Sequence, residues 1–304
     1  MAQEVSVPQS ADIVPAIVEE SSRLRRDLIV AIEGATGRNV LNYSATAFGF
    51  SAEAMEPSDI VNLARVMSKS PKLSGVDLVL NSPGGRPETA EKIIMALRRF
   101  YDNDLRVVVP EFAKSAATIV ALGAREICMG FCSELGPIDP QIFVPDESGR
   151  GIFRSAHAIV ESVDGYVRKV HEAIQNNQPF LGHLRMLDFV PNLPFVEECR
   201  LAQRLAREIA VTWLKTEMLK DQPEKAEKVA DTLSRADQLY SHSRAIDFRR
   251  AKEDLGLSVR YLAPEEPLWQ KVWELHIRSH WAMLQNRWAK VIESRSTTTF
   301  VAQI

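Results

Sequence analysis

Apolar residues in the first half of the chain come in short runs that alternate with longer amphipathic stretches. Five of these runs have the length of buried strands, at 27–33, 39–47, 76–80, 105–109 and 126–129, and a sixth strand-like run follows later in the chain at 257–261. Helical spacing of apolar residues follows Pro57 and recurs at 89–101 and 115–123. Strands that alternate with helices through short connections predict an α/β fold with a parallel sheet and flanking helices.

Beyond about residue 141 the pattern is mainly helical, with expected helices at 154–176, 195–235, 245–255 and 268–292. Pro264 and Pro267 mark a boundary before the last of these. The pattern therefore predicts three segments: a loosely ordered arm at 1–23, a main α/β domain at 24–264, and a C-terminal helical arm at 265–304 that ends in a frayed tail.

The expected last helix carries an apolar seam whose members recur at intervals of four or three: Trp269, Trp273, Ile277, Trp281, Leu284, Trp288 and Val291. Two interpretations stay open. The helix packs on its own domain, or it joins protomers in a homo-oligomer. We favour the contact between protomers, because the helix lies beyond the proline boundary and aromatic residues are enriched at interface cores.

Composition narrows the class of protein. The 304 residues are 45% hydrophobic and 25% charged, as in ordinary globular proteins. The formal net charge is -3, whereas proteins that bind nucleic acid usually carry an excess of basic residues. We therefore expect no nucleic-acid partner. No apolar stretch approaches the roughly 18 residues of a membrane span. The first residues do not resemble a secretory signal, so we expect a cytoplasmic protein without a membrane span.

Two loops carry candidate chemistry, and each follows a strand at the edge where parallel sheets bind their ligands. Asn81-Ser-Pro-Gly-Gly85 contains two glycines that leave backbone N–H groups uncovered for an anion or oxyanion. Phe112-Ala-Lys-Ser-Ala-Ala-Thr118 places Ser115 at the start of a helix of small residues, a position that suits a nucleophile. Each loop alone is also consistent with a plain turn or a helix cap, but together they could form one site.

These two loops, followed by Glu134-Leu-Gly-Pro-Ile-Asp-Pro-Gln141, resemble the Clp protease/crotonase superfamily. Within it the closest similarity, from about residue 27 to about 262, is to the serine dehydrogenase proteinase family, relatives of signal peptide peptidase A. The resemblance implies a Clp-like fold and a serine peptidase that acts on peptides or proteins. It also implies Ser115 as nucleophile and an oxyanion hole from the N–H groups of Gly84, Gly85 and Ala116. We expect no cofactor and no metal, because the chain has no dinucleotide fingerprint and no complete set of metal ligands in its sequence.

The general base is less certain from the sequence. Clp-type proteases use a histidine roughly twenty-five residues after the serine, but the first histidine after Ser115 here is His157. Signal-peptide-peptidase relatives use a lysine, which can act only where burial keeps part of it neutral. Lys169 is the candidate that the resemblance implies, and Lys92 is the other contender. Lys114, adjacent to the serine, faces another side of the helix and departs from the small residue usual in the family.

Two other functions stay open. One is a catalytically degenerate assembly subunit of the same fold. The other, which we favour less, is an acyl-CoA crotonase-type enzyme, because crotonases generally lack a serine at this position and the chain shows no basic patch for coenzyme phosphates. His276 and His280 have metal-ligand spacing but no acidic residue between them and no third ligand beside them in the sequence, so we expect a surface or packed pair rather than a metal site.

Overall fold

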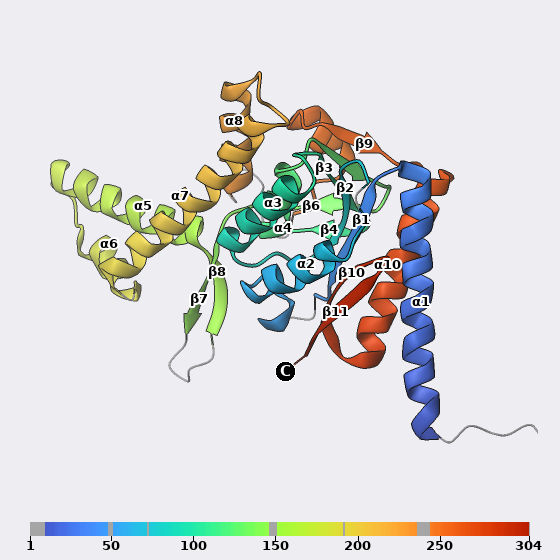
Figure 1. Ribbon diagram of the computed structural model, residues 1–304. Coiled ribbons are helices and arrows are strands. Elements are labelled where there is room, and N and C mark those ends of the chain that lie inside the picture. The colour runs from blue at the N-terminus through green and yellow to red at the C-terminus, as the bar shows by residue number, and fades with distance from the viewer. Residues whose placement is uncertain are drawn as a thin grey trace, which may run out of the picture.

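The computed structural model describes residues 10–47, 51–71, 73–145, 151–190, 192–235 and 244–303. Its centre is a seven-stranded sheet in the order β11-β10-β1-β2-β3-β5-β9, with helices on both faces (Figure 1). Five neighbouring strands are parallel, and all five were predicted: β1 (Asn39–Ala45), β2 (Val76–Asn81), β3 (Leu105–Val109), β5 (Glu126–Met129) and β9 (Val259–Tyr261). The α/β fold class is confirmed.

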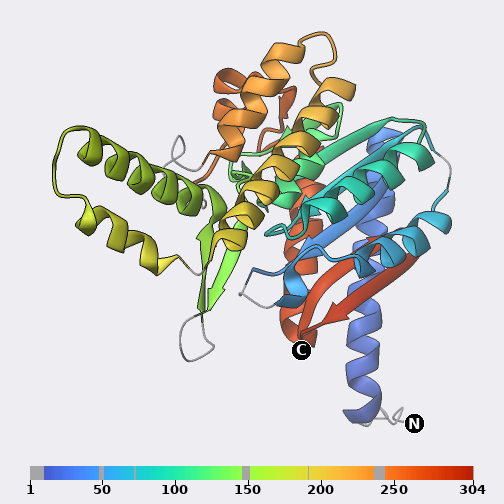
Figure 2. The same ribbon diagram turned by 90° about the vertical axis from the view of Figure 1, so that its left-hand side faces the viewer.

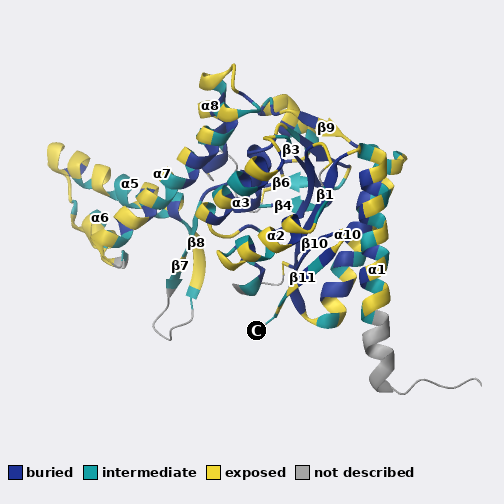
Figure 3. Cartoon of the chain, in the orientation of Figure 1, coloured by how far each residue is buried: buried dark blue, intermediate teal, exposed yellow. Residues whose placement is uncertain are grey.

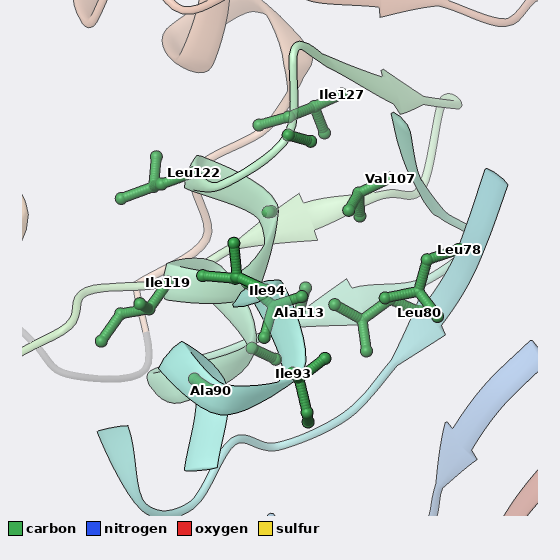
Figure 4. Packing of buried hydrophobic residues seen from close by; sticks show 14 of the residues in the cluster. Leu78, Leu80, Ala90, Ile93, Ile94, Val107, Ala113, Ile119, Leu122 and Ile127 are labelled. Carbon is green, nitrogen blue, oxygen red and sulfur yellow. The ribbon is translucent and has the colours of Figure 1, made fainter. Parts of the chain in front are cut away.

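Successive side chains on each strand point to opposite faces, which separates two buried layers. Leu78, Leu80 and Val107 belong to the larger core, with α2 (Ser58–Ser68), α3 (Pro87–Phe100) and α4 (Ala116–Leu122). Figure 4 shows side chains of α3 and α4 over these strand residues. Val79 and Val108 belong to the opposite core, with α1 (Ser10–Thr36) and α10 (Pro267–Asn286).

The first helix corrects two predictions. Residues 27–33 are not a strand, and the described part of the predicted arm at 1–23, from Ser10 onward, is helical, while residues 1–9 lie outside the described residues. Ile29 and Ile32 are buried against the sheet, whereas Val30 between them is 39% exposed. Two buried positions three residues apart lie on one face of a helix. The prediction of a strand was wrong because this short apolar run follows the helical repeat and not the two-residue repeat of a strand.

The C-terminus also differs from expectation. α10 ends at Arg287, which has the left-handed conformation that closes many helices. The chain then forms β10 (Trp288–Ser294) and β11 (Thr297–Ala302), and β10 pairs antiparallel with β1. The predicted helix to residue 292 and the frayed tail are therefore wrong. Residues 265–304 build the central sheet and do not form a separate arm.

A second subdomain projects from the sheet (Figures 1 and 2). It starts with the hairpin of β7 (Gln141–Pro145) and β8 (Gly151–Ser155), then α5 (Ala156–Gln175), α6 (Leu181–Arg185) and the short helix η2 (Met186–Phe189). Much of its surface is exposed (Figure 3). We call residues 141–190 the projecting arm.

The chain returns to the body along α7 (Leu193–Thr216) and α8 (Pro223–Ser234). The shorter elements are η1 (Ser51–Glu53), β4 (Phe112–Ala113), β6 (Glu134–Leu135) and the π-helical turn η3 (Arg250–Asp254). Among the helices described, none combines the length and apolarity that crossing a bilayer requires.

Candidate active site

The two predicted loops lie side by side at the carboxyl ends of β2 and β3. Ser82 forms an isolated parallel bridge with Ala113, in which Ser82 N–H donates to Phe112 C=O at 3.0 Å and Lys114 N–H donates to Ser82 C=O at 3.0 Å. The side chain of Asn81 adds a third tie by accepting from Phe112 N–H at 3.0 Å. The glycine loop is thus bonded directly to the segment that leads into Ser115.

Gly84 makes the closest approach between the two loops. A Cβ on Gly84 would lie 2.5 Å from the Lys114 carbonyl oxygen and 2.7 Å from Ser115 Cβ, and the φ of Gly84 is +102°. Only glycine tolerates this conformation and this distance without a shift of the backbone. Gly84 is therefore required for two reasons: its φ is one that other residues rarely adopt, and no side chain fits between the two loops.

Ser115 has the backbone conformation of a strained strand-to-helix turn. Its φ is 51° and its ψ is -120°, and it lies directly before the first residue of α4. A non-glycine residue with such angles costs of order 1–3 kcal/mol, and such residues cluster at functional sites. The Ser115 side chain makes no capping hydrogen bond to α4. Ser115 therefore occupies the N-cap position of α4 without capping it through its side chain, and the residue is half-buried at this sharp turn.

Gly85 and Ala116, two of the residues that the resemblance implies for an oxyanion hole, line the same cleft as Ser115. Ala116 is the first residue of α4, where an N–H has no carbonyl partner within its own helix. Gly85 bridges Met55 in parallel, and the bonds of that bridge run from Met55 N–H to Gly84 C=O at 2.7 Å and from Arg86 N–H to Met55 C=O at 3.1 Å. In such a bridge the N–H of Gly85 itself points away from Met55.

The N–H of Gly84 is already engaged, since it donates to Ser82 Oγ at 3.1 Å. Of the three N–H groups that the resemblance implied, Gly85 and Ala116 are thus the better placed donors. Gly84 instead lets the loop approach Ser115. Met55, which bonds to both neighbours of Gly85, could not be selected from the sequence, because a single buried methionine has no local signature.

A cleft of about 1090 Å³ opens in front of Ser115. Its apolar lining comes from the glycine loop, α4, the β7–β8 hairpin and α7, and includes Pro83, Ile119, Ile138, Ile142, Phe153, Leu201 and Leu205. Its charged lining residues are Glu56, Arg86, Glu88, Arg204 and Glu208. Among the described residues that line this cleft there is no lysine and no histidine.

The candidate bases lie elsewhere in the single chain. Lys169 is exposed on α5 in the projecting arm, with its Nζ 4.8 Å from the ring centroid of Tyr166. Lys92 is exposed on α3. The structure brings neither of them into the cleft lining.

Lys114 has a structural contact. Its Nζ lies 2.6 Å from Glu134 Oε1 and donates to Leu135 C=O at 3.2 Å. It thereby ties the segment before Ser115 to the Glu134–Gln141 motif, which explains how a charged residue fits next to the serine.

His276 and His280 lie on α10, on the other face of the sheet from α4. His276 is buried, and its Nε2 is 3.2 Å from Glu111 Oε2. The described residues contain no group of three or more His, Cys, Asp or Glu side chains that could hold a metal ion. His276 thus contacts Glu111, and the ring centroids of His276 and His280 lie 6.2 Å apart.

Comparison with known proteins supports the resemblance over the part of the chain that carries both loops. Residues 48–155 match the model of the ClpP-like SDH-type serine proteinases. Two uncharacterized proteins of Methanocaldococcus jannaschii, MJ0137 and MJ1495, are 37% and 33% identical to this chain over 84 residues, which is 28% of the chain in both comparisons. The matched region spans only 29% and 28% of the length of these relatives.

Among solved structures, two mutants of a membrane-bound stomatin-specific protease are similar to this chain. One is a serine-to-alanine mutant with 14% identity and a TM-score of 0.29, covering 70% of this chain and 94% of that one. The other is a lysine-to-alanine mutant in complex with a substrate peptide, with 16% identity and a TM-score of 0.31, covering 74% and 94%. The family match is the stronger finding. It confirms that the segment 48–155, with Ser115 and the glycine loop inside it, resembles the ClpP-like SDH-type serine proteinases.

Proposed function

We propose that this chain is a serine peptidase in which the Ser115 hydroxyl attacks the carbonyl carbon of a peptide bond. The carbonyl oxygen becomes an oxyanion that the N–H groups of Gly85 and Ala116 stabilise. A base takes the hydroxyl proton and passes it to the leaving amine as the C–N bond breaks. Water then hydrolyses the acyl-enzyme on Ser115.

One observation carries this proposal. Ser115 has a strained backbone conformation and makes no cap bond, and it sits at the mouth of a cleft beside two backbone N–H groups. A helix start without a function needs neither the strain nor the close approach of Gly84. The apolar lining of the cleft favours a peptide or protein substrate that places apolar side chains beside the scissile bond.

The identity of the base is a separate part of the proposal. We retain Lys169 as the candidate, with Lys92 as the alternative. A dyad with Lys169 requires α5 to approach a cleft, either through movement of the projecting arm or by contribution from another copy of the chain. Because a lysine must lose its proton before it can accept one, this dyad predicts activity that rises through the alkaline range.

A catalytically degenerate assembly subunit is the second candidate. The observation that favours it is the lack of a lysine or histidine among the described residues that line the cleft. The two functions are separated by peptide hydrolysis. We expect the parent protein to cleave an unstructured protein substrate and Ser115→Ala to be inactive with an unchanged circular dichroism spectrum. A parent without hydrolytic activity, or an active alanine variant, would contradict the peptidase.

We also propose that the protein acts as a homo-oligomer. Of the predicted seam on α10, Trp269 is buried in its own domain, but Ile277, Trp281 and Leu284 are 47%, 59% and 38% exposed. Exposed aromatic and aliphatic side chains on one helix suit a contact between copies. Light scattering at micromolar concentration should give the mass of more than one chain, and Trp281→Ala should lower it. A monomer would contradict this proposal. A cytoplasmic location stays a prediction.

A further inference from the structure

A fully buried ion pair lies beneath the glycine loop and is not used in the mechanism above. Lys290 on β10 has a side chain 2% exposed, and Asp59 near the start of α2 has a side chain 0% exposed. Lys290 Nζ donates to both carboxylate oxygens of Asp59 at 2.8 Å. Removing two charges from water is costly, so a buried pair that persists calls for a structural or functional reason.

The same ammonium also holds a backbone carbonyl. Lys290 Nζ donates to Ala54 C=O at 2.8 Å, and Asp59 Oδ2 accepts from the N–H of Glu56 at 2.9 Å. The hydroxyl of Tyr43 donates to Asp59 Oδ2 at 2.8 Å. Burial, and then the neighbouring Asp59 carboxylate, raises the pKa of Tyr43 well above its usual value, so this hydroxyl stays a donor. The pair therefore fixes the segment 54–56 from both ends.

Met55, in the middle of this segment, is the residue that bridges Gly85. Its N–H bonds to Gly84 C=O and its C=O accepts from Arg86 N–H. A Cβ on Gly85 would clash with the backbone of Met55, so the two chains are in direct contact. The position of the Gly85 N–H beside Ser115 is thus set by a segment whose own position is set by Lys290 and Asp59.

We infer that Lys290 and Asp59 are positioning residues for the oxyanion hole. The inference rests on the proposed function and deepens it. The C-terminal hairpin would then contribute to catalysis without touching the substrate, by holding Gly85 N–H at the place where the oxyanion forms. Hydrogen-bond donors to an oxyanion act mainly in the transition state. Loosening the loop should therefore lower kcat and leave KM nearly unchanged.

The test compares two substitutions in buried ion pairs of the same strand. Lys290→Met removes the donor to Ala54 and Asp59. Arg25→Met is the matched control, because Arg25 Nε bonds Glu293 of β10 at 2.9 Å with both side chains 0% exposed, and the other hydrogen bonds of Arg25 go to Ser21 and Ser22 on α1. Both variants leave a buried carboxylate without its cation. Only Lys290→Met acts on the segment that holds Gly85.

Activity is measured per active site, with a fluorophosphonate probe used to count reactive serines. We expect kcat of Lys290→Met to fall roughly tenfold to a hundredfold, since a misplacement of about 1 Å at a reacting centre has effects of that size. Arg25→Met should keep the parent kcat per active site. Equal kcat values for the two variants would overturn the inference.

A double variant and a hydrogen-exchange measurement test the inference even if Lys290→Met does not fold or the protein has no measurable activity. The double variant Lys290→Met with Asp59→Asn removes the unpaired carboxylate, so it should fold if Lys290→Met does not, and it should show the same loss of kcat. Hydrogen exchange of the amides of Met55 and Arg86 should be faster in the Lys290 variants than in Arg25→Met, whether or not the protein has activity. Unchanged exchange would overturn the inference alone, whereas full activity in Ser115→Ala would overturn the proposed function first.

Discussion

Gly84 and Ser115 belong to different strand–helix units, yet a methyl group on Gly84 would lie 2.7 Å from Ser115 Cβ. This contact explains why a glycine pair and a serine thirty residues later work as one feature. Gly85 and Ser115 line the same cleft, and Ser115 is half-buried at a sharp turn. A substitution at Gly84 should therefore displace Ser115.

Gly84→Ala should reduce activity strongly. The added Cβ must displace the Lys114 carbonyl or Ser115, and alanine also disfavours the φ of +102°. We expect kcat to fall at least as far as the hundredfold or more that follows loss of one oxyanion donor. Gly34→Ala in α1 is the matched control, because a Cβ there meets nothing within 4 Å. Equal activity of the two variants would show that the Gly84 contact has no catalytic importance.

The pH dependence of hydrolysis tests the base. With a lysine base, kcat/KM should rise through the alkaline range, whereas a histidine base gives a rise near neutrality. Lys169→Met should abolish activity and Lys92→Met should not. If both variants retain parent activity, the lysine dyad is wrong, and if only Lys92→Met is inactive, the base lies on α3.

Two tryptophans of α10 should differ in their effect on stability. Trp269 is 2% exposed and Trp281 is 59% exposed. Trp269→Ala should lower the free energy of unfolding by about 3–5 kcal/mol, as expected for a large core side chain. Trp281→Ala should change the unfolding of the isolated chain by about 0.5 kcal/mol or less. Urea denaturation of both variants at low protein concentration measures this, and equal losses would contradict the placement of α10.

Stability should depend on the ionisation of Glu111. The hydrogen bond from His276 lowers the pKa of Glu111 below its usual 4.5, against the opposing effect of burial. A folded pKa below the unfolded one means a contribution that is complete above about pH 4.5 and is lost as the pH falls through the folded pKa. Glu111→Gln should therefore destabilise the protein at pH 6 and matter less toward pH 3. A constant difference in unfolding free energy between pH 6 and pH 3 would contradict the pair.

Much of the sheet was predictable because its strands β2, β3 and β5 are short, mainly apolar runs that end in recognisable turns. The candidate site was predictable for the same reason, since its loops follow these strands directly. The bounds of α3, α4 and α5 also agree closely with the helical periodicity. Local sequence was informative wherever local preference and tertiary structure favoured the same conformation.

The terminal elements could not be predicted, because their burial depends on partners far away in the sequence. Charged residues in β10 are typical of an exposed helix face, but here they are buried in ion pairs. Lys290 is paired with Asp59, and Glu293 is paired with Arg25. Trp288 continued the four-residue interval of α10, and Arg287 ends that helix without the usual glycine. The buried face of α10 runs from Trp269 through Val272, Leu275 and Met283, and it leaves Trp281 exposed. Which face of α10 is buried depends on where α1 and the sheet lie against it, and this cannot be read from the sequence of α10.

Covalent labelling followed by peptide mass spectrometry tests directly whether Ser115 is the nucleophile. The parent protein is incubated with a fluorophosphonate and digested, and the modified residue is located. We expect one phosphonylated serine, at Ser115, and no labelling of Ser115→Ala. Ser68→Ala, at an exposed position on α2, should label like the parent. Labelling at another serine, or undiminished labelling of Ser115→Ala, would contradict Ser115 as the nucleophile.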